Sequence, residues 1–206
     1  TDLDPDDTLT YGVDDAGVQV VVPGHSNPFL SAQPDGTTAS GGDVTPDQSP
    51  VWVQAITPVP GEAIRFDASG FSSHAGGASG PGPDGASSVS RGEELGIAGY
   101  TLPLNSLVGV FLGSDIPADP ATPPAGLDFS TPESRNQTVI APEVEQIFFI
   151  GDGRTDDGTP HDVIVPAGAT RLYLGTSDGF GWYNNTGAFE VSVVSSVYDG
   201  PAVDPG

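Results

Sequence analysis

The side chains best suited to bind a metal ion lie in one loop near the end of the sequence. Asp178 follows the apolar segment 171–175, and Asn184 and Asn185 precede the next one, 188–197. Ca²⁺ in proteins takes about six to eight oxygen ligands from carboxylates, amides and backbone carbonyls. One Asp, two Asn and the loop carbonyls meet that demand, and the low ligand charge favours the modest affinity of extracellular calcium modules. The alternative is an ordinary hairpin loop, where Asp, Asn and Gly are common because they suit turns.

Two other acidic groups are weaker calcium candidates. The loop 151–159 contains Asp152, Asp156 and Asp157, which resemble the start of an EF-hand but lack its register and its distal Glu. This loop is a candidate second metal site, and the alternative is an ordinary solvated turn that binds no metal. A third cluster combines Asp35, Asp43 and Asp47.

Two common catalytic motifs are missing from the sequence. It has no His-Glu-x-x-His and no phosphate loop, and it contains neither Cys nor Lys. The pairs Glu93/Glu94 and Glu143/Glu145 suggest a glycoside hydrolase as a minor alternative, since such enzymes use two carboxyl groups. Any acidic protein offers such pairs, so we expect that the protein is not an enzyme and predict no catalytic residues.

Composition limits the fold and the partners. The 206 residues include 28 Asp or Glu and five Arg, for a net charge of −23, with 29 Gly and 21 Pro. Gly and Pro at this level argue against a helical bundle. Nucleic acid and anionic membrane surfaces are excluded as partners because both require clustered cations. The sequence has no apolar run long enough for membrane insertion. The acidity favours bound cations such as Ca²⁺ or, alternatively, reflects a solubilising or halophilic surface.

Short segments rich in Val, Ile and aromatic residues, bounded by Gly, Pro, Asp or Ser, predict an all-β antiparallel β-sandwich. In the last of them Phe189, Val191 and Val193 share one face, opposite Glu190 and Ser192. Only residues 91–100 suggest a helical turn. We expect an extended N-terminal arm over 1–49, a sandwich domain over 50–206 and a Pro-rich insertion near 113–136. The predicted strands are 17–23, 51–56, 63–68, 107–112, 138–141, 146–150, 163–165, 171–175 and 188–197.

Two segments resemble the calcium-dependent galactophilic (PA-IL-type) lectins and their secreted bacterial relatives. One is the loop from Asp178 to Phe189, and the other is Phe66-Asp-Ala-Ser-Gly-Phe-Ser-Ser-His-Ala-Gly. The resemblance implies a galactose-binding-lectin-like sandwich in which Ca²⁺ bridges the two loops and holds sugar hydroxyls. It assigns backbone carbonyls of His74 and Trp182, and side-chain oxygens of Asp178, Asn184 and Asn185, as calcium ligands.

Trp182 and Tyr183, beside the predicted metal loop, are candidate sugar-binding residues, because sugar C–H surfaces pack on aromatic rings. Both rings could instead plug the sandwich or anchor a second subunit. The family's His and Gln sugar contacts have no counterpart, since 81–88 reads Pro-Gly-Pro-Asp-Gly-Ala-Ser-Ser. The metal site therefore carries over better than the sugar site.

These observations lead to two functional hypotheses. The first is a secreted, calcium-binding structural subunit of an extracellular filament, tube or surface layer, forming a homo-oligomer or polymer. Its arm, with the β segment Val18–Val22, would add a strand to a neighbour's sheet. The alternative is a calcium-dependent carbohydrate-binding lectin module with glycans as partners. Both place the protein outside the cell or at its surface, and the start at Thr1 suggests a processed chain.

Overall fold

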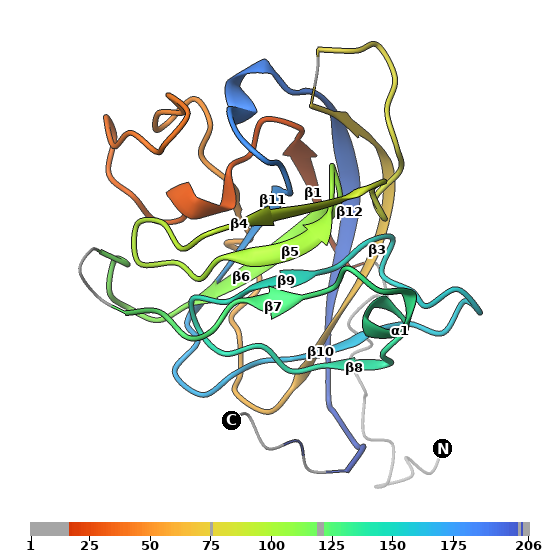
Figure 1. Ribbon diagram of the computed structural model, residues 1–206. Helices are drawn as coiled ribbons and strands as arrows, with labels where there is room; N and C mark the ends of the chain where they lie inside the picture. The colour runs from red at the N-terminus through yellow and green to blue at the C-terminus, as the bar shows by residue number, and fades with distance from the viewer. Residues whose placement is uncertain (1–16, 75, 119–121, 202, 204–206) are drawn as a thin grey trace, which may run out of the picture.

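The computed structural model describes residues 17–74, 76–118, 122–201 and 203, whose regular secondary structure is almost entirely β (Figure 1). In chain order the elements are β1 (Val18–Pro23), η1 (Pro28–Leu30), β2 (Val51–Trp52), β3 (Ala63–Ser73), β4 (Ser88–Arg91), β5 (Tyr100–Pro103), β6 (Leu107–Leu112), β7 (Leu127–Asp128), α1 (Pro132–Arg135), β8 (Val139–Ile140), β9 (Ile147–Phe149), β10 (Asp162–Ile164), β11 (Arg171–Thr176), η2 (Trp182–Asn184) and β12 (Thr186–Ser196). The expected all-β fold is confirmed.

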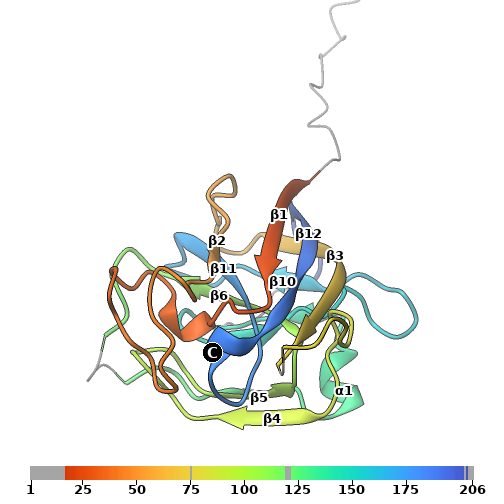
Figure 2. The ribbon, with the colours of Figure 1, turned by 90° about the horizontal axis from the view of Figure 1, so that it is seen from above.

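The strands form two main sheets and one small sheet. The five-stranded sheet has the order β1-β12-β3-β10-β8, the four-stranded sheet β2-β11-β6-β9, and the small sheet β4-β5-β7. Neighbouring strands are antiparallel except in the pairs β10–β8 and β5–β7. The long strands β3 and β12 lie side by side along the molecule, and β1 lies beside β12 at the margin of its sheet (Figure 2).

Alternating burial in β12 fixes which face of the five-stranded sheet meets the core. Phe189, Val191 and Val193 are fully buried, whereas Glu190 is exposed, as the sequence pattern predicts. By contrast, all six residues of β6 are buried. A strand buried along its whole length has both faces covered, and η1 is among the elements that contact β6.

The N-terminal segment is part of this fold over its described residues, 17–49, rather than an arm that extends from it. Strand β1 pairs with β12 of the same chain, from Val18 with Val193 to Pro23 with Ala188. The turn η1 inserts Phe29 into the core, fully buried. Asn27 caps this turn by accepting a hydrogen bond from the Phe29 N–H. The described part of the segment therefore completes its own sheet and core.

Two other expectations need correction or refinement. Residues 91–100 form no helical turn, because β4 ends at Arg91, β5 begins at Tyr100, and Leu95 between them has a left-handed φ of 52°. The Pro-rich insertion, described over 113–118 and 122–136, contains the elements β7 and α1. Phe129, between those two elements, is almost fully buried and belongs to the core.

The helical segments in the described part of the chain have only three or four residues each, far fewer than a membrane-spanning helix requires.

Candidate metal site

Asp178 is the second residue after β11, and its side chain lies in the protein interior. Its backbone N–H and C=O both bond to the Tyr100 hydroxyl, at 3.1 and 2.7 Å. Its Oδ1 accepts hydrogen bonds from the N–H groups of Gly179 and Phe180. The side chain is 4 % exposed, and Oδ2 has no hydrogen-bond partner among the described residues. A buried carboxylate oxygen without a donor is a candidate cation ligand.

Asn185 lies at the other end of the same loop and shows the same feature. Its backbone N–H donates to the Trp182 carbonyl at 2.9 Å, closing the turn η2. Its Nδ2 donates to the Gly24 carbonyl at 3.1 Å, while Oδ1 is buried and has no partner within the described chain. The hydrogen bond to the Gly24 carbonyl fixes the orientation of the Asn185 side-chain amide, so that the oxygen and not the nitrogen is without a partner.

Asn105, which the sequence did not single out, provides a third oxygen of this kind. It occupies the turn between β5 and β6 with a left-handed φ of 64°, and its N–H donates to the Ser177 carbonyl at 2.9 Å. The side chain is 2 % exposed. Its Nδ2 lies 3.0 Å from Nδ1 of His74, and its Oδ1 has no partner in the part of the chain that the structure describes.

The loop after β3 meets the same region. Thr186 Oγ1 donates to the Gly77 carbonyl at 2.6 Å, and a Cβ atom at Gly76 would lie 3.7 Å from the Asn184 carbonyl oxygen. Together with the contact between His74 and Asn105, these links bring residues 73–77 (described without 75), 104–106, 177–178 and 184–186 to one end of the sandwich. We call this place the loop junction.

The five predicted ligands are therefore grouped, but in different environments. Asp178 and Asn185 are buried, whereas the side chains of His74 and Asn184 are exposed. Of the seven buried side-chain atoms without a partner in the described residues, three are Asp or Asn oxygens, and all three belong to the loop junction. These are hard oxygens of the type that Ca²⁺ prefers.

The two aromatic residues of η2 differ sharply. Trp182 is fully buried, its Nε1 donates to the Thr176 carbonyl at 2.8 Å, and its ring packs edge-on against Phe29. That ring has no exposed face for a sugar, so it plugs the sandwich. Tyr183 is 59 % exposed, and its neighbour in the loop, Phe180, is 64 % exposed.

The third acidic cluster is not a cluster in the fold. Asp43 is fully buried, and its carboxylate accepts hydrogen bonds from the N–H groups of Trp182 and Tyr183 and from Nδ2 of Asn27. It thus caps η2 from the N-terminal segment. Burial raises the pKa of Asp43, and the nearby charge of Asp178 raises it further, against the lowering effect of these hydrogen bonds. Asp35 and Asp47 are exposed.

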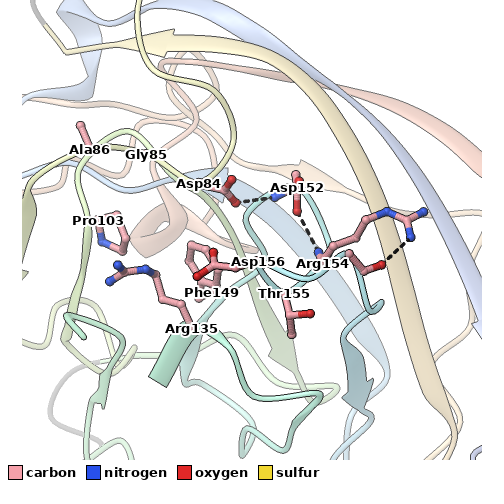
Figure 3. A pocket seen from close by; sticks show the side chains of 11 residues that line it. Asp84, Gly85, Ala86, Pro103, Arg135, Phe149, Asp152, Arg154, Thr155 and Asp156 are labelled. Carbon is pink, nitrogen blue, oxygen red and sulfur yellow. Dashed lines mark hydrogen bonds between the residues drawn. The ribbon is translucent and has the colours of Figure 1, made fainter. Parts of the chain in front are cut away.

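The loop 151–159 also divides its carboxylates among separate partners. Asp157 Oδ1 accepts from Thr155 and Thr159, whereas Asp156 Oδ2 accepts from Nδ2 of Asn136. Asp152 instead faces Asp84, which accepts a hydrogen bond from the Asp152 N–H at 2.9 Å (Figure 3).

This pair of carboxylates lines a half-open cavity of about 470 Å³ that Arg135 and Arg154 also border. Across all residues that the structure describes, no three Asp, Glu or His side chains gather closely enough to hold a metal by themselves. A second metal centre built from Asp152, Asp156 and Asp157 stays a prediction.

Of the pair Glu93/Glu94, Glu94 has a structural role. Glu94 Oε2 forms an ion pair with Arg91 at 2.6 Å, and both side chains are mostly buried. Arg91 also donates to the Gly179 carbonyl at 2.7 Å and lies over the Phe29 and Trp182 rings. Glu94 therefore helps to fix the loop that contains Asp178.

No protein-family model matches this chain, and no curated protein matches it significantly.

Proposed function

We propose that this chain is a non-catalytic, calcium-binding β-sandwich that serves as a structural subunit of an extracellular assembly. The observation that carries the calcium proposal is the set of buried, unpartnered oxygens at the loop junction: Asp178 Oδ2, Asn185 Oδ1 and Asn105 Oδ1. One Ca²⁺ held by these atoms would tie the loops after β3, β5 and β11 together. The exposed Asn184 side chain and the carbonyls of His74 and Trp182 are proposed to complete the ligand set.

Energetics support a cation at this place. A buried acceptor left without a partner costs about 1–3 kcal/mol, and three of them lie at one junction. Asp178 also repels the buried Asp43, which a positive ion beside Asp178 would relieve. With a single carboxylate among the proposed ligands, we expect a dissociation constant on the order of 10⁻⁴–10⁻³ M.

Calorimetric titration with CaCl₂ tests this proposal. We expect the wild-type chain to bind Ca²⁺ and Asp178→Asn to lose the strongest site, because the replacement removes the only carboxylate while preserving its size. The matched control is Asp35→Asn, which makes the same charge change at an exposed turn. Equal calcium stoichiometry and affinity in Asp178→Asn and the wild type would refute the ligand assignment.

The charge of the chain makes the proposed assembly depend on cations. At −23, copies repel one another, and bound or screening cations reduce that repulsion. We expect the particle mass from light scattering to exceed 20.9 kDa in millimolar Ca²⁺ and to fall after chelation. A monomer of unchanged mass under both conditions would remove the assembly role and leave calcium binding in place.

The second candidate, a calcium-dependent lectin, is favoured by the exposed rings of Phe180 and Tyr183 in the loop that contains Asp178 and Asn184. An exposed aromatic ring could pack on the C–H surface of a sugar while the neighbouring cation binds the sugar's hydroxyl groups. A glycan array probed at saturating Ca²⁺ distinguishes the two roles. Calcium-dependent signals on the array would favour the lectin, and an empty array would favour assembly.

A further inference from the structure

Strand β1 is the longest strand at the margin of any sheet in the described part of the chain. The strands at the margins of the three sheets are β1, β8, β2, β9, β4 and β7. The others have two to four residues, whereas β1 has six. No described strand pairs with β1 on the side away from β12. Its sequence, Val-Gln-Val-Val-Val-Pro, contains no charged residue in a chain with 28 acidic ones.

The direction of the hydrogen bonds follows from the ladder with β12. The Gly24 N–H donates to the Gly187 carbonyl at 2.9 Å, directly beyond the last pair of the ladder. Residues of an antiparallel strand alternate in the direction of their N–H and C=O groups. The groups of Val18, Val20 and Val22 therefore point to β12, and those of Gln19 and Val21 point outward. Pro23, which has no N–H, falls on the outward side, where an edge strand tolerates proline.

We propose that β1 pairs antiparallel with β1 of a second copy of this chain, about a two-fold axis at Val20. In this register Gln19 of each chain exchanges two hydrogen bonds with Val21 of the other. Val20 faces its own equivalent in the intervening pair. Two five-stranded sheets would thereby join into one continuous sheet of ten strands. This inference deepens the proposed assembly role and rests on it. Pairing between two β1 edges takes the place of the sequence-based hypothesis that the N-terminal segment adds its strand to a neighbour's sheet.

Charge favours a second copy as the occupant of this edge. A basic partner would be attracted to the acidic faces, whereas the uncharged strip is where another acidic chain can approach with least repulsion. The nearest exposed carboxylate along the sheet is Glu190, opposite Val21 on β12. In the proposed dimer the two copies of Glu190 would be separated by at least three strand spacings, about 14 Å. That exceeds the Debye length of about 8 Å at physiological ionic strength.

The exposed apolar surface of β1 supports the same reading. The Val21 side chain is 58 % exposed and, with Gln19, Val20 and Glu190, borders a shallow hollow on the sheet. Pairing would cover part of this surface and give partners to the four outward polar groups of Gln19 and Val21. An open edge of this type is a known template for pairing with another chain.

Cysteine cross-linking tests the register, since the chain has no native cysteine. Equivalent residues at the two-fold axis lie about 4.5 Å apart at Cα, within the range for a disulfide. We expect most molecules of the Val20→Cys variant to become disulfide-linked dimers on mild oxidation. The matched control, Val18→Cys, places its two sulfurs about 14 Å apart and should stay below one tenth cross-linked. Equal cross-linking of both variants, or of neither, would overturn the register.

Light scattering of the wild type and of Val21→Pro tests the dimer itself. The substitution removes an outward N–H and leaves the ladder with β12 intact, so we expect the mass to fall from twice the chain mass to a single chain. The control is Val197→Pro, at a residue that is 81 % exposed and outside β12. A wild type that is monomeric up to about 1 mM, or a Val21→Pro variant that remains dimeric, would refute the proposal. Calcium titration of Val21→Pro, which alters no proposed ligand, separates this failure from failure of the calcium site.

Discussion

The carboxylate of Asp43 and the backbone N–H of Trp182 form a hydrogen bond of 3.1 Å across 139 residues of sequence. Asp43 Oδ1 accepts a second bond from the Tyr183 N–H at 2.8 Å, so one side chain caps the turn that precedes Asn185. The N-terminal segment thus determines the shape of the loop to which we assign calcium. Neither residue is a side-chain ligand in the proposal, yet both position the ligands.

Asp43→Ala should therefore destabilise the chain and weaken calcium binding together. The substitution leaves two backbone N–H groups and the Asn27 amide without an acceptor in a buried place, which costs on the order of 3 kcal/mol. Thermal unfolding with and without Ca²⁺ measures both effects. Asp47→Ala, at an exposed position in the same segment, is the control. Wild-type stability in Asp43→Ala would show that the cap contributes nothing.

Asn105→Gly separates a ligand from a structural residue. Asn105 has a left-handed φ of 64°, which glycine adopts without strain, so the variant keeps the turn and removes the side-chain amide, both its oxygen and the Nδ2 contact with His74. We expect calcium affinity to fall about tenfold, equivalent to about 1.4 kcal/mol. In chelator, stability should stay within about 1 kcal/mol of the wild type, since an unpartnered buried oxygen has been removed. A large loss of stability in chelator with unchanged calcium affinity would assign Asn105 a purely structural role.

Substitution of the two neighbouring rings should have opposite consequences. Trp182→Ala removes a fully buried side chain and should reduce stability by about 3–5 kcal/mol. Tyr183→Ala removes an exposed ring and should change stability by no more than about 0.5 kcal/mol. Chemical denaturation measures both values. If the chain binds glycans, Tyr183→Ala should abolish that binding while the protein stays folded, and retained binding would exclude this ring from the sugar site.

The carboxylates of Asp84 and Asp152 predict a dependence on pH. Burial raises the pKa of Asp152, and repulsion from Asp84 raises it further. Because its pKa in the folded protein lies above the unfolded value, protonation favours the folded state, and this group adds stability as the pH falls through the folded pKa. Asp84→Asn should lower the pKa of Asp152 and reduce that gain, as a carboxyl ¹³C NMR titration would show. Asp156→Asn serves as the control, and an unchanged Asp152 pKa in Asp84→Asn would contradict the prediction.

The strands that the sequence predicts are those with continuous or alternating apolar residues, such as β6, β11 and β12. Strand β4, Ser88–Arg91, was missed because it pairs within the small sheet and contains only one apolar residue. The second half of β3 was also missed, because Gly70 reads as a strand breaker. In the structure Gly70 has a φ of 107°, and a Cβ atom there would lie 2.3 Å from the Ala188 carbonyl oxygen, so close approach of β12 requires this glycine.

The loop junction was predictable where its residues lie within one loop. Asp178 and Asn185 border the same turn, so their proximity follows from local spacing. Asn105 was not predictable, because Leu-Asn-Ser between two apolar segments has the appearance of any turn. Asp43 was predicted as a metal ligand within an acidic cluster, and only the tertiary fold shows that backbone N–H groups surround it. In both cases the deciding contact joins segments far apart in sequence.

The pairing of β1 with β12 has a consequence for how the chain folds. Val18 pairs with Val193, so nearly the whole described sequence must be in place before the first strand finds its partner. Contacts between such distant segments slow folding, because the chain entropy of closing a long loop is lost before the contact contributes stability. On the ribosome, the apolar segment Val18–Pro23 would wait unpaired until the last strand emerges. Productive folding of this protein should therefore depend strongly on synthesis reaching β12, and chains released earlier should be the ones that aggregate.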